Sequence, residues 1–344
     1  MGEGTDYHTF HQQKSGAMIL VTGATGLVGS HLLVELTSQG KRVRALKRTS
    51  SSTDAVKMLF CHYQIPENSF NQIEWIEGDV TDYNSIILAL TGVAEVYHCA
   101  GLVSFKKSDL YKLLEVNVQG TANMVDASLQ CGVKKFCHVC SIATLGSPKD
   151  SSVDESCAWE KTKGKSGYAV SKFRAEMEVW RGIEQGLNAT IVNPSVILGP
   201  SSWTSGSGLL FKAVEKGLPF YTLGMTGYVD VRDVVKGMIS AMEKEQWGKR
   251  FVHNGQNLTH KELFTTIALA MGKKPPFIEI KPWMVMVIKP FVWLASLLSS
   301  KLETSVSGFY SKTQYSSDRA EKVLEMKFHP ISEAVANTVK AGRI

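Results

Sequence analysis

A tyrosine and a lysine four residues apart, Tyr168 and Lys172, begin an expected long helix that runs to about residue 185. Residues at this spacing lie on one helical face. A phenol with a pKa near ~10 is a poor acid–base catalyst at neutral pH, but a nearby ammonium favours the phenolate and lowers that pKa. The pair can therefore exchange a proton with an alcohol oxygen. Ser141, at the end of an apparent strand, can hold the same oxygen by a hydrogen bond.

Three glycines, Gly23, Gly26 and Gly29, separate an apolar run at 18–21 from an apolar-periodic stretch at 30–39. Strand, glycine-rich turn and helix together predict a dinucleotide site rather than a tight turn without a ligand. The glycines allow a sharp turn, close approach of a pyrophosphate and tight helix packing, and the helix N-terminus attracts phosphate. The other residues of this expected cofactor turn are Thr25, Leu27 and Val28.

The end of the second expected strand, residues 42–46, indicates which dinucleotide binds. An acidic residue about 20 positions after the glycines usually selects NAD. This chain has Lys47 and Arg48 there, and cations suit the 2′-phosphate of NADP. NADP is therefore favoured over NAD, the alternative being a solvated basic strand end.

Further expected strands and helices alternate along the chain, so we predict an α/β fold with a doubly wound parallel sheet. Ligands of such sheets bind at the carboxyl ends of the strands. Asp79 and Val80, which follow the third strand, are expected at the adenine. Ala100 and Gly101, which follow the fourth, are expected to let the cofactor pass close to the backbone. The expected strands after the second span residues 73–77, 95–101, 136–140 and 189–192.

The glycine pattern, Asn117, Ser141 and the Tyr168–Lys172 pair together resemble the extended short-chain dehydrogenase/reductase family. The resemblance implies a Rossmann fold and a Ser–Tyr–Lys triad. In that triad Tyr168 is the acid–base, Lys172 positions the ribose and tunes Tyr168, and Ser141 orients the carbonyl. Asn117 matches the position that supports the family's proton relay; the alternative is a surface asparagine.

The run Asn193-Pro-Ser-Val-Ile-Leu-Gly-Pro200 resembles a loop of the dihydroflavonol reductase, cinnamoyl-CoA reductase and 3β-hydroxysteroid dehydrogenase branch. The resemblance implies that Pro194, Ser195 and Val196 line the nicotinamide. Sugar-nucleotide dehydratases carry Asp-Glu just after the position of Ser141, where this chain has Ile142 and Ala143. That branch is therefore disfavoured.

These patterns predict an NADP(H)-dependent carbonyl reductase or alcohol dehydrogenase for a hydrophobic or aromatic ketone, aldehyde or secondary alcohol. Two alternatives remain: a sugar-nucleotide epimerase with tightly bound NAD, and a non-catalytic dinucleotide-sensing scaffold. Ser104 and Trp203 are candidate substrate contacts.

The 344 residues are expected to form a mobile arm at 1–17, a Rossmann domain at 18–200 with a return segment at 226–255, and a mostly helical substrate lobe at 201–344. The apolar stretch 282–298 is too short to span a membrane. It predicts a core helix, a lid or a peripheral membrane contact.

The formal net charge of +6 comes without a long basic run, so nucleic acid is not an expected partner. The six cysteines lie mostly in apolar segments. They are expected to be buried thiols of a cytoplasmic protein. Cys137 and Cys140 lie within a strand on opposite faces, so no metal site is expected there. A homodimer is compatible with the sequence but not specified by it.

Overall fold

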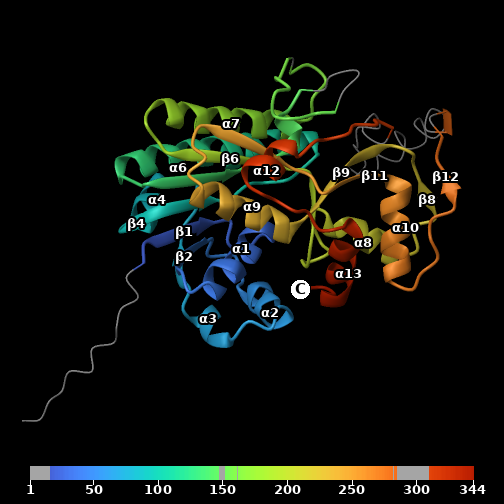
Figure 1. Ribbon diagram of the computed structural model, residues 1–344, viewed down its shortest axis with the longest axis horizontal. Coiled ribbons are helices and arrows are strands. Elements are labelled where there is room, and N and C mark those ends of the chain that lie inside the picture. Colours follow the sequence, from blue (N-terminus) through green and yellow to red (C-terminus); the bar gives the residue numbers. More distant parts are fainter. Residues whose placement is uncertain (1–15, 147–151, 161, 282, 285–309) are drawn as a thin grey trace, which may run out of the picture.

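The computed structural model describes residues 16–146, 152–160, 162–281, 283–284 and 310–344. Their main feature is a seven-stranded parallel sheet in the order β10-β6-β5-β4-β1-β2-β3, which confirms the predicted doubly wound fold (Figure 1). The predicted arm and the apolar stretch 282–298 lie almost entirely outside the described residues. The seven strands are β1 (Met18–Thr22), β2 (Arg42–Lys47), β3 (Glu74–Glu77), β4 (Val93–His98), β5 (Lys135–Val139), β6 (Ala189–Pro194) and β10 (Lys249–His253).

Two hydrophobic cores cover the two faces of this sheet. In β1, Ile19 and Val21 join the core under α1, α2 and α9, whereas Leu20 joins the core under α4, α6 and α7. Alternate residues of a strand point to opposite faces, so a strand buried on both sides is apolar throughout. The covering helices are α1 (Leu27–Ser38), α2 (Asp54–His62), α3 (Glu67–Asn71), α4 (Tyr83–Ala89), α6 (Gly120–Gln130), α7 (Gly167–Glu184) and α9 (Val231–Glu243).

Short helical segments fill the connections after β4 and β5. The chain enters α6 through a 3₁₀ turn, one turn of α-helix and a π-helical segment. Another 3₁₀ turn directly follows Ser141. The segments are η1 (Lys107–Asp109), α5 (Leu110–Leu113), η2 (Leu114–Gln119) and η3 (Ile142–Thr144).

A smaller lobe lies beside the carboxyl ends of the strands and contains two small sheets as well as helices (Figure 1). Its core contains Trp203, Phe211, Leu263 and Val335. The domain boundaries given above stay a prediction. The elements of this part are β7 (Val196–Leu198), α8 (Gly208–Glu215), β8 (Phe220–Tyr221), β9 (Met225–Asp230), β11 (Gln256–Thr259), α10 (His260–Ala270), β12 (Ile278–Glu279) and α13 (Ile331–Ala341). Helix α12 (Asp318–Val323) instead packs against β10 of the main sheet.

Strands β1 and β4 are neighbours, and the chain continues from them to opposite sides of the sheet. Such a switch point leaves a crevice at the carboxyl ends of the strands, where ligands of this fold bind. The glycine turn after β1 and the Ala100–Gly101 turn after β4 lie side by side at this edge, since a Cβ on Gly23 would lie 2.6 Å from the Ala100 nitrogen. The fold therefore brings the two predicted cofactor turns together.

The cysteines correct one expectation. Cys137 and Cys140 are buried in opposite cores, as their spacing predicts, but Cys61 and Cys131 are exposed. Both exposed thiols lie at or next to the C-terminal end of a helix, where apolar neighbours in sequence do not imply burial. Among the described residues no helix is long and apolar enough to cross a membrane, and no three His, Cys, Asp or Glu side chains converge on a metal position.

Candidate active site and cofactor site

The glycine turn leaves no room for side chains at two of its three positions. Gly23 has φ +61°, and a Cβ there would lie 2.6 Å from the Ala100 nitrogen. A Cβ on Gly29 would lie 2.2 Å from the Gly23 carbonyl oxygen, so α1 packs directly on the turn. At Gly26 the nearest atom is 3.2 Å away, and this residue is exposed. The turn thus presents bare backbone at Gly26 to the crevice.

Helix α1 begins at this turn with Leu27 and Val28, and no side chain caps its N-terminus. The first turn of a helix leaves backbone N–H groups unpaired and carries a partial positive charge. No acidic residue lies in this turn to offset that charge. The uncapped helix end and the glycine cradle fit a dinucleotide pyrophosphate, with the partly buried Thr25 beside them.

The basic residues after β2 differ in their surroundings. The Lys47 ammonium lies 2.8 Å from Glu77 Oε1 on β3, and Thr49 Oγ1 donates to the other oxygen of the same carboxylate. Arg48 is exposed, and no ion pair holds it within the described part of the chain. Of the two predicted phosphate ligands, Arg48 is therefore the one whose charge is not already balanced.

Asp79 and Val80 lie after β3, on the same side as this basic pair. The Asp79 carboxylate accepts hydrogen bonds from the nitrogen and the hydroxyl of Thr81, at 2.9 and 2.8 Å. Val80 is buried against Gly120 of α6. The turn is rigid, but one carboxylate oxygen of Asp79 is already engaged within it.

A chain of buried hydrogen bonds fixes the turn at Ala100. Thr121 Oγ1 donates to the Asn117 carbonyl at 2.6 Å, so it accepts from Nε2 of His98 at 3.1 Å. Nδ1 of His98 then accepts from Thr22 Oγ1 at 2.8 Å, and that hydroxyl accepts from the Ala100 nitrogen. Burial lowers the pKa of His98 to about 3, so the ring is neutral as this chain requires.

Tyr168 and Ser141 come together at the carboxyl end of β5. The phenol of Tyr168 is hydrogen-bonded to the Ser141 side chain. Burial raises the pKa of Tyr168 to about 12, and the bond to Ser141 offsets only part of this rise. The Tyr168–Lys172 spacing predicts a pKa below the ordinary value, and the structure corrects the direction of that shift. Tyr168 is a neutral phenol at physiological pH.

The position of Lys172 accounts for this correction. Its ammonium is buried and donates to the Val139 carbonyl at 2.8 Å rather than to Tyr168. Burial also lowers the pKa of Lys172, while the nearby Glu176 carboxylate opposes that shift. The ammonium faces the β4 turn, because a Cβ on Gly101 would lie 3.8 Å from Nζ.

Asn117 is buried in the π-helical segment η2, so it is not a surface asparagine. Its Oδ1 accepts from the Leu102 nitrogen at 2.7 Å, and its Nδ2 donates to the Leu102 carbonyl and to Ser171 Oγ. Ser171 in turn donates to the Tyr168 carbonyl. Asn117 therefore joins the β4 turn to the start of α7.

Pro194, Ser195 and Val196 lie at the junction of two strands: Pro194 ends β6, Val196 begins β7, and Ser195 joins them. The Ser195 nitrogen donates to the His253 carbonyl of β10, which fixes the backbone. Ser195 is 4 % exposed, and its buried hydroxyl has no hydrogen-bond partner among the described residues. A buried polar atom of this kind fits a site that a ligand completes.

The two predicted substrate contacts lie in different surroundings. Ser104 is in the loop after β4, and its hydroxyl donates to Asp109 at 2.6 Å. Trp203 is buried in the core of the smaller lobe, stacked on Phe211. A substrate role for Trp203 stays a prediction that this packing does not support. Next to Ser104, the exposed ring of Phe105 lies edge-on to Tyr168, with centroids 5.6 Å apart.

The sequence reasoning missed Phe105 and a buried network around Glu176. Glu176 lies four residues after Lys172, so the spacing that singled out the Tyr–Lys pair also places it on the same helical face. No local pattern marks Phe105, because its contact with Tyr168 joins a loop to a helix far along the chain.

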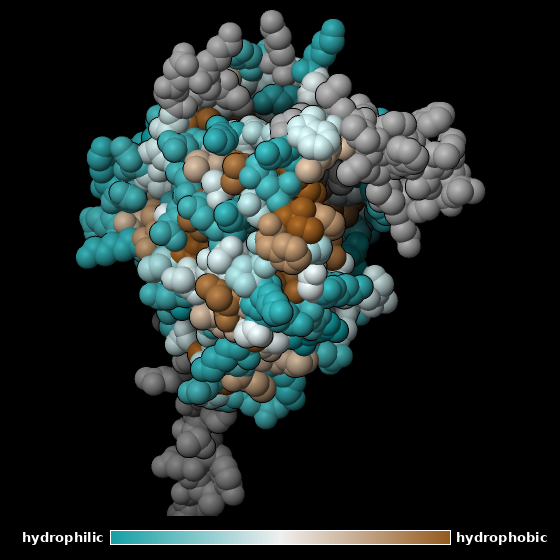
Figure 2. Space-filling model, turned by 90° about the vertical axis from the view of Figure 1, so that its right-hand side faces the viewer, coloured by the Kyte–Doolittle hydropathy of each residue, from teal (hydrophilic) through white to brown (hydrophobic). Residues whose placement is uncertain are grey.

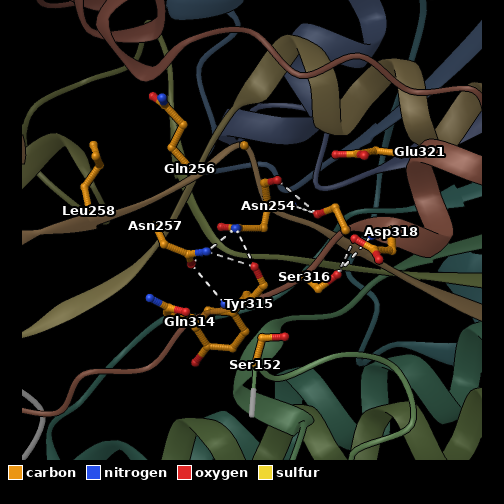
Figure 3. Close-up of a pocket in the computed structure, with 12 residues that line it drawn as sticks. Ser152, Asn254, Gln256, Asn257, Leu258, Gln314, Tyr315, Ser316, Asp318 and Glu321 are labelled. Carbon is orange, nitrogen blue, oxygen red and sulfur yellow. Dashed lines mark hydrogen bonds between the residues drawn. The ribbon is translucent and has the colours of Figure 1, made fainter.

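A separate polar pocket of about 580 Å³ lies where residues 314–318 pack against β11 (Figure 3). Its amides mostly hold backbone: Asn254 Nδ2 and Asn257 Nδ2 both donate to the Tyr315 carbonyl, and Asn257 Oδ1 accepts from the Tyr315 nitrogen. None of the predicted site residues lines this pocket, and its amides act as a structural clasp.

The model of the NAD dependent epimerase/dehydratase family matches residues 19–252. A putative dihydroflavonol 4-reductase of Synechocystis is 27 % identical, and the match covers 93 % of this chain and 92 % of that protein. Cinnamoyl-CoA reductase 1 of Petunia hybrida is 26 % identical over 69 % of this chain and 72 % of its own length.

Solved structures share the fold. The crystal structure of gox2253 superposes with a TM-score of 0.80 and 28 % identity, covering 96 % of this chain and all of that one. The UDP-glucuronic acid 4-epimerase of Bacillus cereus, solved with UDP-glucuronic acid and NAD, has a TM-score of 0.75 at 18 % identity, covering 94 % and 98 %. That second likeness shows the fold alone. The chain belongs to the NAD dependent epimerase/dehydratase family and is an NAD(P)-dependent enzyme of the extended short-chain dehydrogenase/reductase type.

Proposed function

We propose that this enzyme is an NADP(H)-dependent carbonyl reductase that acts on a hydrophobic or aromatic ketone or aldehyde, or on the corresponding alcohol in reverse. The observation that carries the proposal is the neutral phenol of Tyr168, hydrogen-bonded to Ser141 and flanked by the exposed ring of Phe105. A proton donor lies beside an apolar surface, as reduction of an apolar carbonyl requires.

In the proposed reduction, Tyr168 donates its proton to the carbonyl oxygen while Ser141 holds that oxygen by a hydrogen bond. A bound nicotinamide would supply the hydride for the carbonyl carbon. Lys172, anchored on the Val139 carbonyl, has two further N–H groups to hold the cofactor ribose and the Tyr168 oxygen. Asn117 positions the β4 turn and α7 relative to each other.

Preference for NADP rests on Arg48. A 2′-phosphate carries close to two negative charges and suits the planar guanidinium. Lys47 shares its charge with Glu77, so it contributes less than the sequence alone suggested. NADP over NAD is the finer part of this proposal, and Arg48 is its main determinant.

The apolar character of the substrate rests on the loop after β4. Val103 and Phe105 are 53 % and 63 % exposed, and Phe105 contacts the Tyr168 ring. Figure 2 shows that apolar residues also lie on the outer face of the smaller lobe, which faces the viewer there. A flat aromatic or alicyclic carbonyl compound gains from stacking on such groups.

Oxidation of NADPH, followed by absorbance across a panel of aromatic and alicyclic ketones and aldehydes, tests the proposal. We expect turnover with an aromatic carbonyl, and Phe105→Ala should raise KM for it several-fold more than for a small aliphatic aldehyde. Leu88→Ala, an exposed leucine on α4, is the matched control. Interconversion of a UDP-sugar without net cofactor use, together with NAD retained through purification, would instead identify an epimerase.

A further inference from the structure

Four buried polar side chains from four separate elements meet behind the active-site serine. Glu176 of α7, Thr144 of η3 and Asn193 of β6 are all fully buried, and Arg250 of β10 is 16 % exposed at its side chain. A buried carboxylate is costly unless it is paired and hydrogen-bonded. The partners of the Glu176 carboxylate must therefore offset the cost of its burial.

The two oxygens of Glu176 have different partners. Oε1 accepts from Arg250 Nη1 at 2.9 Å and from Trp180 Nε1 at 3.3 Å. Oε2 accepts from Thr144 Oγ1 at 2.6 Å and from Asn193 Nδ2 at 2.9 Å. One oxygen is thus tied to the frame of the protein, and the other is tied to groups that reach Ser141.

Both partners of Oε2 also contact the backbone carbonyl of Ser141. Thr144 Oγ1 lies 3.0 Å from this oxygen and Asn193 Nδ2 lies 3.2 Å from it. The carbonyl also accepts from the Thr144 nitrogen at 3.1 Å, which closes the 3₁₀ turn. Because the single hydroxyl proton of Thr144 goes to Oε2, the donors to the Ser141 carbonyl are Asn193 Nδ2 and the Thr144 nitrogen. Glu176 therefore orients Asn193 and, through the Thr144 hydroxyl, the turn that carries the Thr144 nitrogen, and so holds the Ser141 peptide and its hydroxyl.

The charge of Glu176 is maintained. Burial alone would raise its pKa, but the hydrogen bond from Thr144 and the charge of Arg250 bring the pKa below its ordinary value. An ionised carboxylate accepts stronger hydrogen bonds than a neutral one. The same charge opposes the loss of the proton from Lys172 one helical turn earlier.

We infer that Glu176 is a positioning residue for Ser141: its carboxylate, held by Arg250, orients Thr144 and Asn193 so that they fix the Ser141 peptide and aim its hydroxyl at Tyr168. The inference rests on the proposed function, because Ser141 matters for turnover only if Tyr168 is the proton donor. It adds an acid, a hydroxyl and an amide, all fully buried, that act through Ser141.

The test removes one partner of each Glu176 oxygen. Thr144→Val removes a donor from Oε2 at nearly constant shape, and Trp180→Phe removes one from Oε1. We expect Thr144→Val and Glu176→Gln each to lower kcat roughly tenfold with KM for NADPH within about twofold, since a small misplacement of a catalytic group is costly. Trp180→Phe should have the wild-type kcat. Thr144→Ser, which keeps the hydroxyl that Thr144→Val removes, should also have a kcat near that of the wild type.

The kcat of the double variant Thr144→Val/Glu176→Gln should be no lower than that of the less active single variant, because both changes interrupt the same chain of hydrogen bonds. Additive losses, wild-type kcat in Thr144→Val, or an equal loss in Trp180→Phe would overturn the inference. Glu176→Gln removes the ion pair of the part-buried Arg250, so melting temperatures of all variants are compared. Thr144→Val remains decisive if Glu176→Gln does not fold.

A second readout needs no substrate. The phenol ¹³C resonance of Tyr168, assigned by its absence in Tyr168→Phe, reports the hydrogen bond from Ser141. It should shift in Thr144→Val and stay in place in Trp180→Phe. A wild-type enzyme that reduces no carbonyl would refute the proposed function, whereas an unshifted resonance in Thr144→Val would refute the positioning role.

Discussion

The cofactor turn and the Tyr168 cluster lie in the same crevice but are built differently. The turn consists of backbone, and at Gly23 and Gly29 the absence of a side chain defines its shape. The Tyr168 cluster consists of side chains from the turn after β5, from α7 and from η2, each held by hydrogen bonds to another element. The first site is therefore sensitive to added atoms, and the second to lost donors and acceptors.

Tyr168→Phe should separate the two sites most sharply. It removes one hydroxyl from the side-chain site and nothing from the backbone site. We expect turnover to fall ~10²–10⁴-fold while NADPH affinity, measured by fluorescence titration, changes less than about twofold. Tyr111→Phe, on an exposed tyrosine of α5, is the control. A Tyr168→Phe enzyme with near-full activity would remove the basis of the proposed mechanism.

Gly29→Ala tests the backbone site. Its Cβ would meet the Gly23 carbonyl at 2.2 Å, so α1 or the turn must move. We expect a lower melting temperature and at least about tenfold weaker NADPH binding, as for other overpacked positions. Gly26→Ala has 3.2 Å of space, so it should weaken binding with little loss of stability. Equal melting temperatures for both variants would contradict the close packing of α1 on the turn.

Arg48→Asp tests the edge of the cofactor site. Because Arg48 is exposed, we expect about a tenfold loss of NADPH affinity, with NADH affinity unchanged or improved. The loss should shrink at high salt, since exposed charges are screened. Lys47→Met should have a smaller effect, because Glu77 already pairs with Lys47. Titration of both cofactors at two salt concentrations checks this order, and a larger effect at Lys47 would reverse it.

The pH profile has the smallest expected effect in the reductive direction. With a pKa of about 12, Tyr168 stays protonated from pH 6 to 9, so its capacity to donate a proton should be constant over this range. Oxidation of the alcohol needs the phenolate, so its rate should rise with pH. Paired pH–rate profiles for both directions check the sign. A reductive rate that falls around pH 7 would mean that bound cofactor brings the pKa of Tyr168 far below its value in this structure.

The fold and the cofactor turn were predictable because their signals are local. A strand buried on both faces and three glycines at fixed spacing determine the turn at β1, and the structure has the predicted sheet. The pKa of Tyr168 was not predictable, because it depends on burial and on the direction in which the Lys172 ammonium points.

Partnering between distant residues was the other limit. The sequence places Lys47 at the end of its strand but does not reveal that Glu77 lies opposite in the sheet register. Trp203 is predicted as a substrate contact, yet it is buried in the core of the smaller lobe. Glu176 was within reach of the four-residue spacing rule, although its partners Thr144 and Arg250 come from elements that only the fold brings together.

The π-helical segment that carries Asn117 has a consequence for how chain length changes are tolerated. Each residue of an α-helix turns the chain by about 100°, and a π turn holds one residue more than an α turn. Deleting one residue from 114–119 would therefore change the direction in which side chains project from the helix, rather than simply shorten it. It would regularise the helix and rotate Asn117 away from Leu102 and Ser171. The π-helical segment therefore sets the direction of the Asn117 side chain, which joins the β4 turn to the start of α7.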